Sequence, residues 1–145
     1  MRGHCLCGAV SFEAEVEKRE SHACHCGMCR RWSGSAMLAV TVPDAGMRIE
    51  GADRVRVFRS SDWAERAWCD TCGSNVWYRI TMNGPFKGNY EVCMGLFDTP
   101  DDLPLAREIY IDRKTSSFAF AGERATMTQA EVEAMFAPPQ AGDGK

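Results

Sequence analysis

The chain has 145 residues, 45% of them hydrophobic, which suffices for one domain with one buried core. Its formal net charge is −3, with 17 Lys and Arg against 20 Asp and Glu, so no basic excess indicates a nucleic-acid partner. The sequence has no run of about 18 apolar residues and no signal peptide pattern at its N-terminus. We therefore expect a cytoplasmic protein with no membrane partner.

Alternation of apolar and polar residues predicts that most of the chain forms short β-strands. A period of two is typical of strands with one buried face. The pattern predicts strands at residues 10–17, 36–42, 47–50, 55–60, 65–69, 74–80, 90–96 and 107–111. Turn-forming residues such as Pro43 and Gly46 follow the second of these strands. We expect a mainly β fold with several short antiparallel strands.

One helix is expected near the C-terminus, over residues 128–136. Thr128 and Glu131 have the spacing of a capping box, and three apolar residues follow at the spacing of one helical face. Prolines at the next positions end the helix. The sequence thus predicts a single domain over residues 1–137 and a disordered tail over residues 138–145.

Seven of the eight cysteines fall into three clusters whose spacings indicate metal ligands. The clusters are Cys5 with Cys7, then Cys24, Cys26 and Cys29, and then Cys69 with Cys72. Structural zinc is closed by four protein ligands, whereas catalytic zinc typically keeps three and leaves one position open. The simplest division is one closed four-thiolate site and one open three-thiolate site, which implies two zinc ions per chain. The closed site would comprise Cys5, Cys7, Cys69 and Cys72, and the open site Cys24, Cys26 and Cys29.

The cysteine spacings also allow a disulfide framework or a redox dithiol. A disulfide framework is disfavoured because the sequence has no export signal, and a thioredoxin-like pair requires a helix after its first cysteine, where we expect strands. Cys93 stands alone and is interpreted as a small buried hydrophobe with no site role. His25 is a candidate fourth ligand, but we expect it to face solvent or to lie beside the ligands. His4 and His22 are interpreted as surface residues.

Two arginines directly follow the middle cysteine cluster. Zinc with three thiolates carries a formal charge of −1, so a nearby cation would moderate that charge and could hold an anionic substrate. Arg30 is therefore a candidate catalytic residue beside Cys24, Cys26 and Cys29. For Arg31, a solvated position on a loop is an equally good interpretation.

The three cysteine motifs resemble those of the GFA family, the glutathione-dependent formaldehyde-activating enzymes and their relatives around centromere protein V. The resemblance rests on residues 5–12, 24–31 and 69–74, with a weaker match at 95–98, and covers roughly residues 3 to 120. It implies a zinc-binding fold of the β-tent type. It also implies that the first and third clusters hold the structural zinc and that the middle cluster holds the catalytic zinc.

The resemblance implies glutathione as the thiol and formaldehyde as the aldehyde, joined by a carbon–sulfur lyase acting in the synthetic direction. An open zinc site fits this role, because coordination to zinc favours the thiolate form of a thiol. Two other classes remain open, a non-enzymatic zinc-binding interaction module and a thiol redox or metal-buffering protein. The first would favour a basic tail, which this acidic chain lacks, and the second would contain free thiols.

Overall fold

The computed structural model describes residues 1–137 and contains eleven strands and two α-helices in that range. The predicted tail at 138–145 lies outside the described residues. The strands are β1 (Arg2–His4), β2 (Ser11–Ala14), β3 (Ser21–Cys24), β4 (Met37–Val42), β5 (Met47–Glu50), β6 (Val55–Arg59), β7 (Ala64–Cys69), β8 (Asn75–Ile80), β9 (Tyr90–Cys93), β10 (Leu105–Ile109) and β11 (Ala125–Met127). The helices are α1 (Gly27–Ser33) and α2 (Gln129–Phe136).

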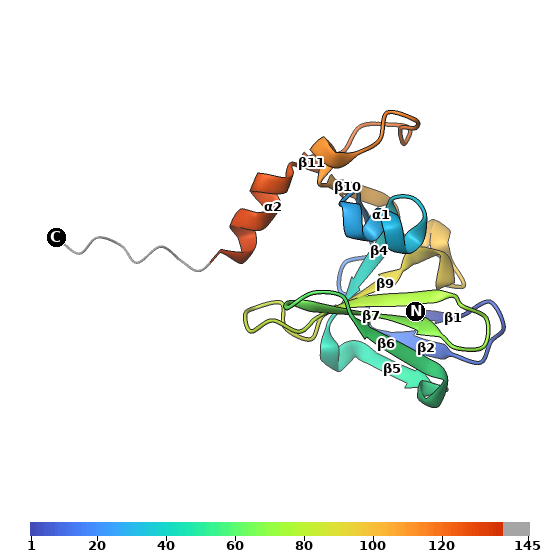
Figure 1. Cartoon of the computed structure of the whole chain (residues 1–145). Helices are drawn as coiled ribbons and strands as arrows, with labels where there is room; N and C mark the ends of the chain where they lie inside the picture. The colour runs from blue at the N-terminus through green and yellow to red at the C-terminus, as the bar shows by residue number, and fades with distance from the viewer. Residues whose placement is uncertain (138–145) are drawn as a thin grey trace.

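The strands form two sheets, which confirms the mainly β fold class (Figure 1). The smaller sheet has the order β1-β2-β5, and the larger has the order β11-β10-β3-β4-β9-β8-β7-β6. Strand pairs are antiparallel except at β10, which runs parallel to both β3 and β11. Parallel pairing needs a long connection rather than a hairpin, and the segments that precede and follow β10 supply it.

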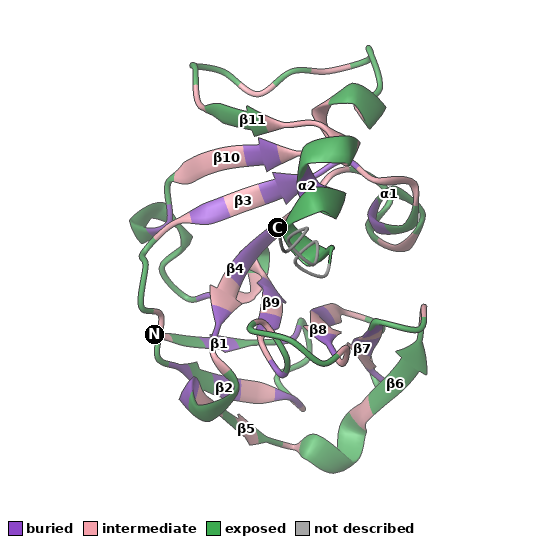
Figure 2. Cartoon of the chain, turned by 90° about the vertical axis from the view of Figure 1, so that its left-hand side faces the viewer, coloured by how far each residue is buried: buried purple, intermediate pink, exposed green. Residues whose placement is uncertain are grey.

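The central strands of the larger sheet have a hydrophobic core on one face and a cavity on the other. On one face Val40, Val42 and Val92 are fully buried and pack in the same core as Phe12 from the smaller sheet. Because successive side chains of a strand point to opposite faces, the intervening residues, such as Ala39 on β4, lie on the other face. Both helices lie on that second face, and Figure 2 shows α2 in front of the middle of the larger sheet.

The structure confirms the predicted strands, with ends that differ by a few residues, and it confirms the capping box. Thr128 is the N-cap of α2. Its side chain accepts a hydrogen bond from the Glu131 backbone N–H, and the Glu131 side chain accepts one from the Thr128 backbone N–H. Strands β1, β3 and β11 were not predicted, nor was α1. In the described range neither helix is long and apolar enough to cross a membrane.

Helix α1 corrects the expectation that the middle cysteines lie among strands. Cys26 is its N-cap, and the Cys26 sulfur accepts a hydrogen bond from the Cys29 backbone N–H at 3.3 Å. Gly34, with φ of 80°, ends the helix after only seven residues. A helix this short carries too few positions to show an amphipathic period in the sequence.

Candidate metal centres and cavity

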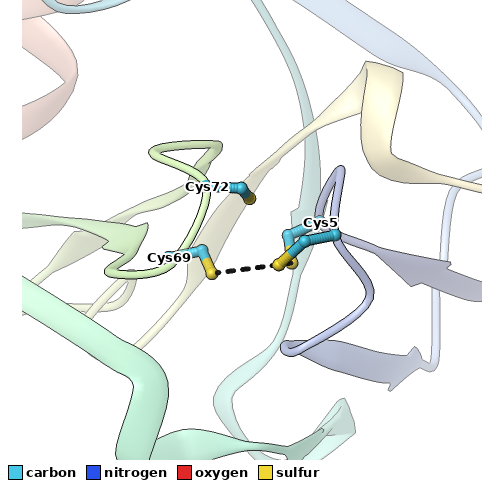
Figure 3. Close-up of side chains that lie close together, drawn as sticks. Cys5, Cys69 and Cys72 are labelled. Carbon is cyan, nitrogen blue, oxygen red and sulfur yellow. Dashed lines mark hydrogen bonds between the residues drawn. The ribbon is translucent and has the colours of Figure 1, made fainter.

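The first and third cysteine clusters meet in the structure although more than sixty residues separate them along the chain. Cys5 and Cys7 follow β1, Cys69 ends β7, and Cys72 lies in the turn before β8. Figure 3 shows Cys5, Cys69 and Cys72 projecting from two separate loops toward one another. The four sulfur atoms all lie within 4.8 Å of one another.

Sulfur separations in this group fit a tetrahedral zinc ion. The Cys5 and Cys7 sulfurs are 3.6 Å apart, and the Cys7 and Cys69 sulfurs are 3.9 Å apart. Zinc–sulfur bonds of about 2.3 Å in a tetrahedron place the sulfurs about 3.8 Å apart. Gly73, with φ of 74°, follows Cys72 directly and allows the tight turn that a residue with a side chain would strain. The donor set and its spacing therefore fit a closed four-thiolate site.

The middle cluster forms a second group at the junction of β3 and α1. Cys24 ends β3, and Cys26 and Cys29 occupy the N-cap and first turn of α1, with all three sulfurs within 4.8 Å of one another. Within residues 1–137 no fourth Cys, His, Asp or Glu side chain joins this group. The three thiols fit a metal ion such as zinc that keeps a fourth position for another ligand.

A buried arginine that sequence analysis missed lies beside the middle cluster. Arg66 on β7 is only 3% exposed, and its two terminal nitrogens lie 3.6 and 3.7 Å from the Cys29 sulfur. Its guanidinium carbon also lies 5.1 Å from the Trp32 ring centroid and 4.9 Å from that of Tyr78. Arg66 thus places positive charge in contact with the Cys29 sulfur, in a setting of low solvent access.

The two arginines singled out from the sequence lie elsewhere. Arg30 and Arg31 are exposed on α1, and neither lines the cavity into which the middle cysteines face. Arg66, in direct contact with Cys29, is placed to provide the charge compensation that the sequence suggested for Arg30. A role for Arg30 at the rim of the site stays a prediction.

A cavity of about 450 Å³ lies directly against the three cysteines. Strands β3, β4, β7, β8, β9 and β10 and both α-helices contribute lining residues, and most of the lining surface is apolar. Its apolar lining includes Met28, Met37, Trp63, Ile80, Met82, Ile109, Val132 and Phe136. Such a concave apolar site with a few polar groups is the usual form of a binding site for a small organic molecule.

Glu91 is the main polar group on the sheet side of the cavity. One carboxylate oxygen accepts a hydrogen bond from the Thr41 hydroxyl at 2.9 Å and lies 3.4 Å from His22 Nε2. Burial raises the pKa of Glu91 to about 7, while burial and the charge of Arg107 lower the pKa of His22 to about 4. The surface position expected for His22 is wrong, because its side chain is largely buried in the cavity wall.

His25 is held behind the ligands rather than exposed to solvent. Its ring is buried, and Nε2 donates a hydrogen bond to the Glu108 carboxylate at 2.8 Å. Arg124 donates to the other oxygen of Glu108 at 2.7 Å. Although desolvation opposes it, hydrogen bonding from His25 and Arg124 lowers the pKa of Glu108. This network holds the segment that carries Cys24 and Cys26, and His25 lies outside the group of three sulfurs.

Comparison with known proteins agrees with this arrangement. The model of the family described as glutathione-dependent formaldehyde-activating enzyme matches residues 1–113. An uncharacterised lyase of Schizosaccharomyces pombe is 31% identical over 130 residues, which are 90% of this chain and 92% of that protein. A crystal structure of a Rhodobacter sphaeroides protein aligns with a TM-score of 0.59 and 26% identity, over 73% of this chain and 100% of the other.

Fungal relatives with a more specific name match over a shorter segment. A putative glutathione-dependent formaldehyde-activating enzyme of Penicillium rubens is 29% identical over 90 residues, which are 61% of this chain and 47% of that protein. The chain thus spans about half the length of the curated relatives that carry this name. Since the family model covers most of the described residues and includes all seven clustered cysteines, the chain belongs to the GFA family, that of the glutathione-dependent formaldehyde-activating enzymes.

Proposed function

We propose that the protein is a zinc-dependent carbon–sulfur lyase that joins a small thiol to an aldehyde beside Cys24, Cys26 and Cys29. The observation that carries this proposal is that three thiols meet on the wall of an apolar cavity. Among the described residues, no fourth metal-binding side chain joins them. The names of relatives, lyase and glutathione-dependent formaldehyde-activating enzyme, support it. On the same basis we propose glutathione as the thiol and formaldehyde or a similar aldehyde as its partner. The cytoplasmic location expected from the sequence stays a prediction.

Two zinc ions per chain complete the proposal. The closed group of Cys5, Cys7, Cys69 and Cys72 would hold a structural ion, and the open group would hold the catalytic one. When bound at the open group, zinc supplies Lewis acidity that lowers the pKa of an incoming thiol. The remaining contributions come from the side chains around it.

In this proposal Arg66 compensates negative charge, and Glu91 transfers a proton. Arg66, in contact with Cys29, offsets the negative charge of a thiolate-rich site, which would otherwise repel the incoming thiolate as a fourth anionic sulfur. Glu91 carries a proton that can pass from its carboxyl group to the carbonyl oxygen of the aldehyde as the carbon–sulfur bond forms. The carbonyl π electrons move to that oxygen, and the proton lost by the thiol restores Glu91, so the reaction is balanced without an oxidant.

One observation favours a thiol redox protein as the second candidate. Cys26 and Cys29 form a C-x-x-C pair at the start of α1, and a helix N-terminus of this kind stabilises a thiolate. The third thiol, Cys24, lies within the same group and has no part in a dithiol mechanism. Metal analysis and a free-thiol count on freshly purified protein separate the two functions, because the lyase requires two zinc ions and the redox protein free or oxidised thiols.

Titration calorimetry on the zinc-loaded protein tests the thiol site itself. Glutathione should bind, and S-methylglutathione should bind far more weakly because its capped sulfur cannot become a thiolate. Arg30→Ala should weaken glutathione binding without loss of zinc if Arg30 attracts a glutathione carboxylate at the rim. Equal affinities for the free and methylated thiols would mean that the sulfur does not reach the metal.

A further inference from the structure

The cavity beside the middle cysteines is much larger than formaldehyde. Its volume is about 450 Å³, whereas a water molecule takes up roughly 30 Å³ of liquid and formaldehyde has only one more heavy atom than water. A substrate of that size would leave most of the apolar wall in contact with water. Unfilled apolar surface of this extent indicates a ligand with an apolar group of its own.

Charges around the cavity disfavour an anionic occupant of its interior. Apart from His22 and the cysteines, the ionisable lining residues are Arg66, Glu91 and Glu133, so Arg66 is the one cation beside two acidic side chains among the described lining residues. Arg66 is already engaged with the Cys29 sulfur and two aromatic rings. An anionic group in the interior would lose its hydration without gaining a free cation, which is costly. The interior therefore suits an uncharged group.

Helix α2 supplies one apolar wall of this interior. Val132 is buried against the cavity, and Phe136, which is 40% exposed, lines its outer part. The Phe136 ring packs against Phe86, from the β8–β9 connection, with centroids 5.5 Å apart. Ile80 on β8 lies on the cavity wall as well. Since α2 lies beyond residues 1–113, this wall is not part of the segment that the family model matches.

We propose that the carbonyl substrate is an aldehyde with an apolar side chain of several carbons, which packs between the α2 wall and β8. This inference rests on the proposed lyase function. The sulfur of the thiol lies at the cysteine group, the peptide part of the thiol extends toward the rim, and the aldehyde side chain fills the apolar interior. The product is a hemithioacetal: one carbon–sulfur bond forms, the carbonyl π bond opens, and its oxygen takes one proton.

A series of aldehydes of increasing length tests the inference by kinetics. With glutathione fixed, catalysed addition above the spontaneous rate is measured for formaldehyde, butanal and hexanal. Each buried methylene should raise kcat/KM up to about fourfold. Phe136→Ala should reduce the preference for hexanal over formaldehyde several-fold. Phe58→Ala is the matched control, because Phe58 is 60% exposed on β6 and does not line the cavity.

Binding of hexanamide, an unreactive neutral analogue, separates this inference from the lyase proposal. Calorimetry on the full zinc-loaded chain should detect hexanamide but not acetamide, and Phe136→Ala should weaken the binding. Hexanamide binding without turnover of any aldehyde would overturn the lyase function and still support an apolar ligand. Turnover of formaldehyde with no preference for hexanal and no hexanamide binding would overturn the apolar substrate and leave the lyase intact. If there is neither turnover nor binding, both are wrong.

Discussion

Replacing Glu91 by glutamine should make the protein's stability depend less on pH. The carboxyl group is about five-sixths buried between Thr41 and His22, and the charge of Arg107 acts on it. Burial raises its pKa from 4.5 to about 7, so between these values the folded protein binds more protons here than the unfolded chain does. The stabilisation from Glu91 is therefore complete below pH 4.5 and is lost as the pH rises through 7.

The size of the effect follows from the pKa difference. A shift of about 2.5 units corresponds to roughly 3 kcal/mol at about 1.4 kcal/mol per unit. Glutamine has nearly the same shape, can still accept a hydrogen bond from the Thr41 hydroxyl, and does not ionise. The free energy of unfolding of Glu91→Gln relative to the native sequence should thus increase by about 3 kcal/mol between pH 4.5 and pH 8.

Urea unfolding of the zinc-loaded proteins across this range measures the difference directly. His22, whose pKa is lowered to about 4, contributes with the opposite sign but is present in both proteins, so its contribution largely cancels. Glu17→Gln, at an exposed position, controls for the loss of one surface carboxylate. Parallel stability curves for the native sequence and Glu91→Gln would refute the raised pKa and remove Glu91 as a proton carrier.

Two further predictions concern the cysteine groups. Cys72→Ser should lower folding yield and thermal stability, because structural zinc binding contributes to folding free energy, whereas Cys29→Ser should keep the fold and lose only the labile zinc. Circular dichroism and zinc counting check this, and two equally unfolded variants would contradict the division into two roles. Arg66→Met should weaken zinc binding at the open group about tenfold or more, with partial recovery in Arg66→Lys. Competition with a chromophoric chelator measures the affinity, and an unchanged value would show that Arg66 does not compensate the thiolate charge.

The grouping of the cysteines was predictable because ligand spacing is local in sequence. Cysteines two or three positions apart show directly which sulfurs can meet on one turn, and the preference of structural zinc for four ligands joins Cys5 and Cys7 to Cys69 and Cys72. The structure brings these sulfurs together as expected. Likewise, the period of two gave most strands of the larger sheet, since each has one face in the core.

Side chains that strand pairing brings together from distant parts of the sequence could not be predicted in the same way. Arg66, Glu91 and His22 lie on β7, β9 and β3, and only the pairing of these strands through β4 and β8 brings them to one cavity. Nothing in the local sequence distinguishes them from charged residues on a solvated strand face. Arg30, adjacent to a ligand along the chain, was the more evident candidate, but the first turns of α1 direct it to the exposed side of the helix.

Strand register also explains why the cation and the carboxyl of the cavity do not neutralise each other. Thr41 pairs with Glu91, Glu91 with Tyr78, and Tyr78 with Arg66, so these residues form one row across β4, β9, β8 and β7. Two strand spacings place the backbones of Glu91 and Arg66 about 10 Å apart, with the Tyr78 ring stacked on the guanidinium between them. Arg66 thereby stays available to the Cys29 sulfur, and burial, by raising the pKa of Glu91 to about 7, favours its protonated form. Addition of a thiol to an aldehyde needs negative charge stabilised at sulfur and a proton supplied to oxygen, and this row offers both to the same apolar cavity.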